Sequence, residues 1–142
     1  MSVRLVDIDH VGIAVASLDE AVEHYRKTLG ADPHHSETIE EQGVREVLFR
    51  AGTSFIQLLE PLGPDTPVGK FIERKGPGLH HIGYRVSSVE QTLSHLKSEG
   101  VRLIDEVPRI GSMGNTIAFV HPKGFDGVLV ELVEQRDIQI DL

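Results

Sequence analysis

The same pattern of hydrophobic and polar positions occurs twice along the chain, with a strand-like stretch, a helical stretch and further strand-like stretches in each half. Runs rich in Val and Ile at 7–15 and 79–86 are typical of strands. Each run is followed by apolar residues at helical spacing. Three further strand-like runs then complete each half. They cover about 33–39, 44–51 and 54–60 in the first half, and about 101–107, 115–120 and 127–134 in the second.

Both predicted helices carry the same start and stop signals. A serine can cap the first turn of each helix, with Glu or Gln three residues later as its capping-box partner. A glycine then suits the left-handed position that ends a helix. These residues are Ser17, Glu20 and Gly30 in the first half, and Ser88, Gln91 and Gly100 in the second. The pattern of each half is therefore a strand, a helix and three strands.

The two halves also match residue by residue, which indicates an internal duplication. DHVGIAV aligns with HHIGYRV when His10 is placed on His81, at an offset of 71 residues. On the last strand of each half, Gln57 aligns with Glu131 at an offset of 74. Because the chain has 142 residues, the repeat nearly fills it.

We predict a single domain, residues 1–142, built of two βαβββ modules. Its parts are a first module at about 6–62, a linker with a short helix at about 63–78, a second module at about 79–135 and a tail at 136–142. Thr66 suits the N-cap of the linker helix and Pro67 its first position, and we expect this helix to run through Arg74. The tail has no obvious partner, and we expect it to be loosely held.

The acidic composition limits the classes of partner. The formal net charge is −8, from 22 acidic and 14 basic residues, which disfavours nucleic acid. An anionic ligand would need a local cationic feature, such as a bound metal, against this charge. The absence of cysteine excludes disulfides, thiolate metal sites and a cysteine nucleophile. The sequence has no run of about 18 apolar residues and no signal-peptide pattern, so we expect no membrane partner and a cytoplasmic location.

Strand alternation and the repeat together select two histidines as candidate metal ligands. His80 and His81 are neighbours on one strand, so they should point to opposite faces of the sheet. His81 aligns with His10, whereas His80 aligns with Asp9. We therefore expect His10 and His81 to form the inner pair. A lone histidine on a strand is more often structural, but matched positions in two repeats favour a metal site.

Gln57 and Glu131 join this pair because both are polar residues within apolar runs, at matched positions. A buried carboxylate must be paired or coordinate a metal. Two imidazoles, an amide oxygen and a carboxylate suit Co, Zn, Ni, Mn or Fe rather than a thiolate-type metal site. Four such ligands leave two octahedral positions open. The site would carry net positive charge and would favour an anionic ligand with two oxygens.

Longer motifs resemble one known family. The chain contains EQGV, LLEPL, GLHHI, PRIG and HPK in this order, besides the more widespread DHVG strand. From about Ile8 to Val133 it is similar to the methylmalonyl-CoA epimerases, also called racemases, of the vicinal oxygen chelate superfamily. The resemblance implies an α+β fold in which two βαβββ modules form an incomplete eight-stranded barrel around a metal site. It also implies a homodimer.

The resemblance also implies ligands, a substrate and catalytic residues. The family's metal ligands carry over to His10, Gln57, His81 and Glu131, the four residues that the repeat selects. One divalent ion per chain is implied, with Co²⁺ first and Zn²⁺, Ni²⁺, Mn²⁺ or Fe²⁺ as other candidates. The implied reaction interconverts (2R)- and (2S)-methylmalonyl-CoA, an acyl-CoA of propionate metabolism, through a metal-stabilised enolate. Inversion needs an acid or base on each face, and by resemblance these groups are Glu46 and Glu131.

Other functions stay open at this point. A glyoxalase of the same superfamily would more often have an acidic ligand in place of Gln57. A ring-cleaving dioxygenase would use two His and one Glu with Fe(II), and a non-enzymatic drug-sequestering protein commonly lacks a complete ligand set. Weaker candidate residues are His24, His34, His35 and His95, which we interpret as polar surface. Lys123 is either an anion contact or part of a solvated turn, and Gly111, Gly114 and Asn115 are candidates for a loop that closes over substrate.

Overall fold

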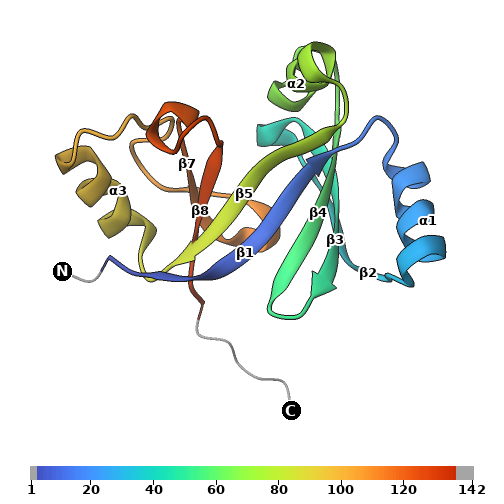
Figure 1. The fold of residues 1–142 in the computed structure, drawn as a ribbon, viewed down its shortest axis with the longest axis horizontal. Helices are drawn as coiled ribbons and strands as arrows, with labels where there is room; N and C mark the ends of the chain where they lie inside the picture. Colours follow the sequence, from blue (N-terminus) through green and yellow to red (C-terminus); the bar gives the residue numbers. More distant parts are fainter. Residues whose placement is uncertain (1–2, 137–142) are drawn as a thin grey trace. The chain divides into compact units, whose positions relative to one another are not determined.

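The computed structural model describes residues 3–136 (Figure 1). Three α-helices and eight strands lie within this part, which confirms the predicted α+β class. In chain order they are β1 Leu5–Ala14, α1 Leu18–Leu29, β2 Pro33–Ile39, β3 Val44–Ala51, β4 Ser54–Pro61, α2 Pro67–Lys75, β5 Gly78–Val86, α3 Val89–Ser98, β6 Arg109–Ile110, β7 Thr116–Val120 and β8 Val130–Glu134. Short 3₁₀ turns cover Glu40–Gln42, Ser112–Gly114 and Pro122–Gly124. Within residues 3–136, no helix is both long and apolar enough to cross a membrane.

The chain divides into two compact units. One contains residues 8–83, and the other contains residues 3–7 and 84–136 of the described chain. Strands β1 and β5 each pass from one unit into the other. In residues 8–83, hydrogen bonding gives the strand order β2-β3-β4-β1-β5. In the other unit, β8, β7 and β6 are neighbours in that order.

The sheet of residues 8–83 packs a different helix on each face. β2, β3 and β4 are antiparallel neighbours, and β1 runs parallel to β4. Leu58 and Leu59 are consecutive on β4, so their side chains point to opposite faces. Leu58 belongs to a buried cluster with residues of α1, whereas Leu59 belongs to a second cluster with residues of α2. The face opposite α1 is the one that carries the candidate site.

Helix α1 forms where the sequence signals predict it. The Ser17 hydroxyl accepts the backbone N–H of Glu20 at 3.3 Å, and Gly30 ends the helix with φ at +63°. The apolar stripe of the helix covers β3 and β4, where Tyr25 stacks on Phe49 with ring centroids 5.3 Å apart. Because this cluster occupies one face of the sheet, α1 leaves the opposite face for other groups (Figure 1).

The second unit repeats this capping around α3. The Ser88 hydroxyl accepts the backbone N–H of Gln91 at 3.2 Å, and Gly100 takes a φ of +77° after the helix. Helix α3 contacts β7 and β8, which are antiparallel. The most deeply buried apolar residues of this unit are Val86, Val89, Leu93, Ile117, Ala118, Val120, Val130, Leu132 and Val133.

The strand predicted at 101–107 is wrong. In the structure Leu103 makes only an isolated bridge to Val120, and the edge strand β6 is a two-residue segment further on. The cause is a turn, because the backbone N–H groups of Ile104 and Asp105 both donate to the carbonyl of Phe119. The Asp105 carboxylate also accepts the Phe119 N–H at 2.8 Å. These hydrogen bonds occupy backbone groups that would otherwise pair in a regular β-ladder.

The predicted linker helix and tail have different outcomes. Thr66 caps α2 by accepting the Gly69 N–H at 3.1 Å, and the helix continues one residue beyond the predicted Arg74. The prediction that the tail has no partner is wrong at Arg136, whose guanidinium donates to the carbonyl of Met113 at 2.8 Å. The rest of the predicted tail, residues 137–142, lies outside the described residues.

Candidate active site

His10 on β1 and His81 on β5 lie side by side in the unit of residues 8–83. Both are buried, and their Nε2 atoms are 2.9 Å apart. The ring planes meet at 80°, with centroids 5.0 Å apart. Two imidazole nitrogens that bind one ion, each about 2.1 Å from it and at right angles, lie about 3.0 Å apart. The paired nitrogens therefore have the separation of two ligands of one metal ion.

The other ring nitrogen of each histidine is also engaged. The Asp9 carboxylate lies 2.7 Å from Nδ1 of His10, and Nδ1 of His80 lies 2.8 Å from Nδ1 of His81. A carboxylate that holds one ring N–H fixes the tautomer and leaves the other nitrogen as a lone pair. Strand alternation predicts that His80 points away from His81, but the two rings are in contact. Alternation alone missed the contacts made by Asp9 and His80.

Gln57 and Glu46 form a second buried pair in the same unit. The Gln57 Nε2 donates to Oε1 of Glu46 at 2.7 Å, and the Glu46 side chain is only 1% exposed. Gln57 lies beside Gly12 across β4 and β1 and beside Leu48 across β4 and β3. Since residues two apart on a strand share a face, Gln57 and Glu46 lie on the face that carries His10.

The amide oxygen of Gln57 has no hydrogen-bond partner among the described residues, although it is buried. A buried acceptor without a partner is costly and calls for an explanation, such as an ion that the oxygen binds. Its neighbours on the same face supply two imidazole nitrogens. Imidazole and amide oxygen are suitable ligands for first-row divalent metals. The residues of this unit therefore fit a divalent metal ion.

Glu131 belongs to the other unit, on β8, and is 4% exposed. It pairs with Phe119 across β7 and β8. A carboxylate this deeply buried needs charged or hydrogen-bonding partners, as is expected of a metal ligand.

A group that the sequence patterns do not indicate lies next to Glu46. Glu37 on β2 pairs directly with Glu46 on β3, and the Oε1 atom of Glu37 is 3.0 Å from Nε2 of His35. The ligand atoms of His35, Glu37 and Glu46 all lie within 4.8 Å of one another. His35 and Glu37 are half-buried, so the buried carboxylate has protonatable neighbours that reach toward solvent. The interpretation of His35 as simple polar surface is therefore incomplete.

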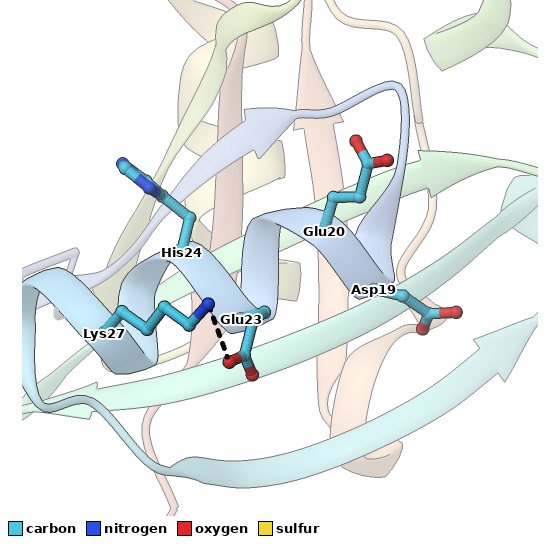
Figure 2. A pocket seen from close by; sticks show the side chains of 5 residues that line it. All are labelled: Asp19, Glu20, Glu23, His24 and Lys27. Atoms are coloured by element: carbon cyan, nitrogen blue, oxygen red, sulfur yellow. Dashed lines mark ion pairs between the residues drawn. The ribbon is translucent and has the colours of Figure 1, made fainter.

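The remaining candidate histidines lie outside this group. His24 is exposed on the outer face of α1, where a shallow hollow is also lined by Asp19, Glu20, Glu23 and Lys27 (Figure 2). Lys27 and Glu23 form an ion pair at 3.6 Å there. His34 is exposed, and His95 lies 4.0 Å from Glu99. The hollow contains none of the predicted metal ligands or catalytic residues.

Two further predictions concern turns of the second unit. Gly111 donates its N–H to the carbonyl of Asn115 at 2.9 Å, which closes the turn predicted to cover substrate. Lys123 lies in a 3₁₀ turn, and its N–H donates to Nδ1 of His121 at 3.0 Å. Partial desolvation, followed by the positive charges of Arg102 and Lys123, lowers the pKa of His121 below 6.5. The substrate roles of this loop and of Lys123 stay predictions.

The chain matches known proteins along most of its length. Residues 9–119 match the sequence profile of the glyoxalase/bleomycin resistance protein/dioxygenase superfamily. The ethylmalonyl-CoA/methylmalonyl-CoA epimerase of Cereibacter sphaeroides is 38% identical over 127 residues, which are 88% of this chain and 95% of that protein. The uncharacterized protein YqjC of Bacillus subtilis is 45% identical over 132 residues, 93% of this chain and 94% of YqjC.

A solved structure also shows that the chain is similar to a methylmalonyl-CoA epimerase. A variant of the methylmalonyl-CoA epimerase of Streptomyces coelicolor, in complex with 2-nitronate-propionyl-CoA, superposes with a TM-score of 0.91. The two chains are 42% identical, and the match covers 95% of this chain and 98% of that one. The chain therefore belongs to the glyoxalase/bleomycin resistance protein/dioxygenase superfamily and, within it, to the methylmalonyl-CoA epimerase family.

Proposed function

We propose that this protein interconverts (2R)- and (2S)-methylmalonyl-CoA and uses one divalent metal ion to do so. The named epimerases among its relatives support the substrate. The observation that carries the metal-dependent mechanism is the position of Gln57. Its amide nitrogen holds the buried Glu46, and its amide oxygen has no partner among the described residues. A single side chain thus connects a metal-binding oxygen with a candidate base.

The proposed metal ligands are His10, Gln57, His81 and Glu131. The pairing of the two Nε2 atoms and the unpartnered Gln57 oxygen support the first three. The matched position of Glu131 in the repeat supports the fourth. We propose Co²⁺ as the ion, with Zn²⁺, Ni²⁺, Mn²⁺ and Fe²⁺ as alternatives that the same ligand types accept.

In the proposed mechanism, each of two carboxylates transfers a proton. When bound, the metal supplies positive charge that stabilises the negative charge developing on the thioester oxygen as the α-proton leaves. Glu46 exchanges the proton on one face of the α-carbon, with its carboxylate oriented by Gln57. Glu131 exchanges the proton on the other face. Asp9 holds Nδ1 of His10 and keeps its Nε2 aimed at the metal position.

An epimerisation assay tests this function. Pure (2S)-methylmalonyl-CoA incubated with Co²⁺-loaded protein should approach an equal mixture of the two α-carbon epimers. The reaction is monitored by the loss of the circular dichroism signal of the α-carbon centre. Two other substrates serve as controls: the hemithioacetal of methylglyoxal and glutathione, and a catechol in an oxygen electrode. Turnover of a control substrate without epimerisation of methylmalonyl-CoA would assign the protein to a different activity of its superfamily.

We also propose that the protein is a homodimer. In residues 8–83 the strand side chains of Ile8 and Leu79 are apolar and exposed, at 44% and 72%. Larger exposed apolar patches mark protein–protein interfaces, and we propose that these two residues belong to such a patch. Light scattering should therefore give twice the chain mass of 15.7 kDa. A mass of one chain at all concentrations would contradict the dimer.

A further inference from the structure

We propose that Gly12 and Gly83 are positioning residues, each of which makes room for the metal-binding histidine of the other strand. The proposal rests on the function above only for the role of the two histidines. It starts from a short pattern that occurs once in each repeat, His10-Val11-Gly12 and His81-Ile82-Gly83. In each, the glycine follows the histidine by two residues and so lies on the same face of its strand.

The space beside each glycine is filled by one imidazole ring. A Cβ atom at Gly12 would collide with Cε1, Nδ1 and Nε2 of His81, and these are its three nearest atoms. A Cβ atom at Gly83 would collide with the same three ring atoms of His10. The arrangement is reciprocal, because each tripeptide supplies one histidine and the space for the other histidine.

Backbone conformation does not explain why these positions are glycine. A positive φ is the usual reason for a glycine, and other glycines of the chain, such as Gly30, have one. Neither Gly12 nor Gly83 is among the residues with positive φ. Close approach of a ring to the backbone is therefore the requirement that these two positions meet.

The consequence of a methyl group at either position follows from the shape of histidine. The ring sits at the end of a side chain with two rotatable bonds, so it can turn away and the fold can survive. Turning the ring moves its Nε2 atom, and the 2.9 Å pairing of the two Nε2 atoms is lost. Metal affinity should therefore fall although the protein still folds.

The first experiment measures Co²⁺ binding by titration calorimetry. Gly12→Ala and Gly83→Ala should each weaken Co²⁺ binding on the order of 10–100-fold, the range seen when a group that orients a ligand is lost. Gly63→Ala is the matched control, since no described atom lies within 4 Å of its added Cβ and its φ is not positive. Wild-type affinity in both Gly12→Ala and Gly83→Ala would overturn the proposal.

A double-mutant cycle on metal-free protein separates this proposal from the proposed function. Gly12→Ala should lower Tm by about 3–10 °C in the wild type and in His10→Ala, because the ring of His81 is still present. In His81→Ala it should lower Tm by at most about 1 °C, because the colliding ring is gone. Gly83→Ala should show the opposite dependence, with its effect abolished in His10→Ala.

The outcomes decide the two proposals separately. If each glycine is coupled to the histidine of the other strand, the positioning role is supported even when the wild-type protein binds no Co²⁺. The absence of Co²⁺ binding would contradict the metal proposal alone. Equal effects of Gly12→Ala in the His10→Ala and His81→Ala backgrounds would overturn the positioning role. Equal effects in the two backgrounds are expected if Gly12 contributes only to the general stability of its strand.

Discussion

Replacing Glu46 with glutamine is expected to lower the epimerisation kcat by about 10²–10⁴-fold, the usual contribution of a positioned acid or base. Glutamine has the shape of glutamate and keeps an oxygen that can accept the 2.7 Å hydrogen bond from Gln57. It cannot take up the α-proton at neutral pH. Fold and Co²⁺ affinity should therefore stay close to those of the wild type, and the loss should appear in kcat measured by circular dichroism.

Glu73→Gln is the control for this change, because Glu73 is exposed on α2. It removes the same charge from the surface and should leave kcat within a factor of about two, as surface substitutions usually do. If Glu46→Gln keeps more than half of the wild-type kcat, Glu46 is not the base. A parallel loss of Co²⁺ affinity and kcat would instead indicate that Glu46 acts mainly by holding Gln57.

Removing the proposed metal ion should also lower the rate strongly. Protein dialysed against a chelator should lose at least about 10³-fold in kcat, because charge stabilisation by a metal is worth several kcal/mol and each 1.4 kcal/mol is tenfold. Adding Co²⁺ should restore the rate. It should also raise Tm, since a ligand that binds only the folded protein stabilises it. The stripped protein should keep its far-ultraviolet circular dichroism.

Mg²⁺ is the control ion for this experiment. It favours carboxylates and water over imidazole, so it should restore much less activity than Co²⁺ at equal concentration. Full activity in chelator-treated protein that contains no metal by elemental analysis would remove the metal from the mechanism. Equal rescue by Mg²⁺ and Co²⁺ would argue against the two histidines as ligands.

Each half of the duplicated chain contains one carboxylate with a proposed proton-transfer role. In the first half the proposed ligand Gln57 is neutral, and the carboxylate is Glu46 on the neighbouring strand. In the second half the matched ligand is Glu131, and the register of β7 and β8 places Ile117, which has no acidic group, where β3 and β4 place Glu46. The halves have thus diverged in complementary ways, as a reaction that needs one base on each face of a carbon requires.

Much of the fold could be predicted from the sequence because local signals and the repeat agree. The caps of α1 and α3 are encoded within a few residues of Ser17 and Ser88, and both helices form as predicted. The pairing of His10 with His81 could be predicted because alternation selects a face and the repeat selects the residue. Two independent patterns then point to the same pair.

The missed features depend on contacts between strands, which periodicity does not encode. The direct pairing of Glu37 with Glu46 follows from the register of β2 and β3. The need for glycine at Gly12 follows from a ring on another strand. The segment predicted as a strand at 101–107 has suitable residues, but the side chain of Asp105 bonds to the backbone of β7 instead. Only the three-dimensional arrangement shows these contacts.

Solvent deuterium wash-in at the α-carbon of methylmalonyl-CoA directly tests the proposed metal-dependent proton exchange by two carboxylates. We expect rapid incorporation from D₂O with Co²⁺-loaded protein and little with chelator-stripped protein. With Glu46→Gln, incorporation should be lost or confined to one epimer, because only the other carboxylate can still exchange its proton. The absence of wash-in with any divalent metal would contradict the proposed mechanism.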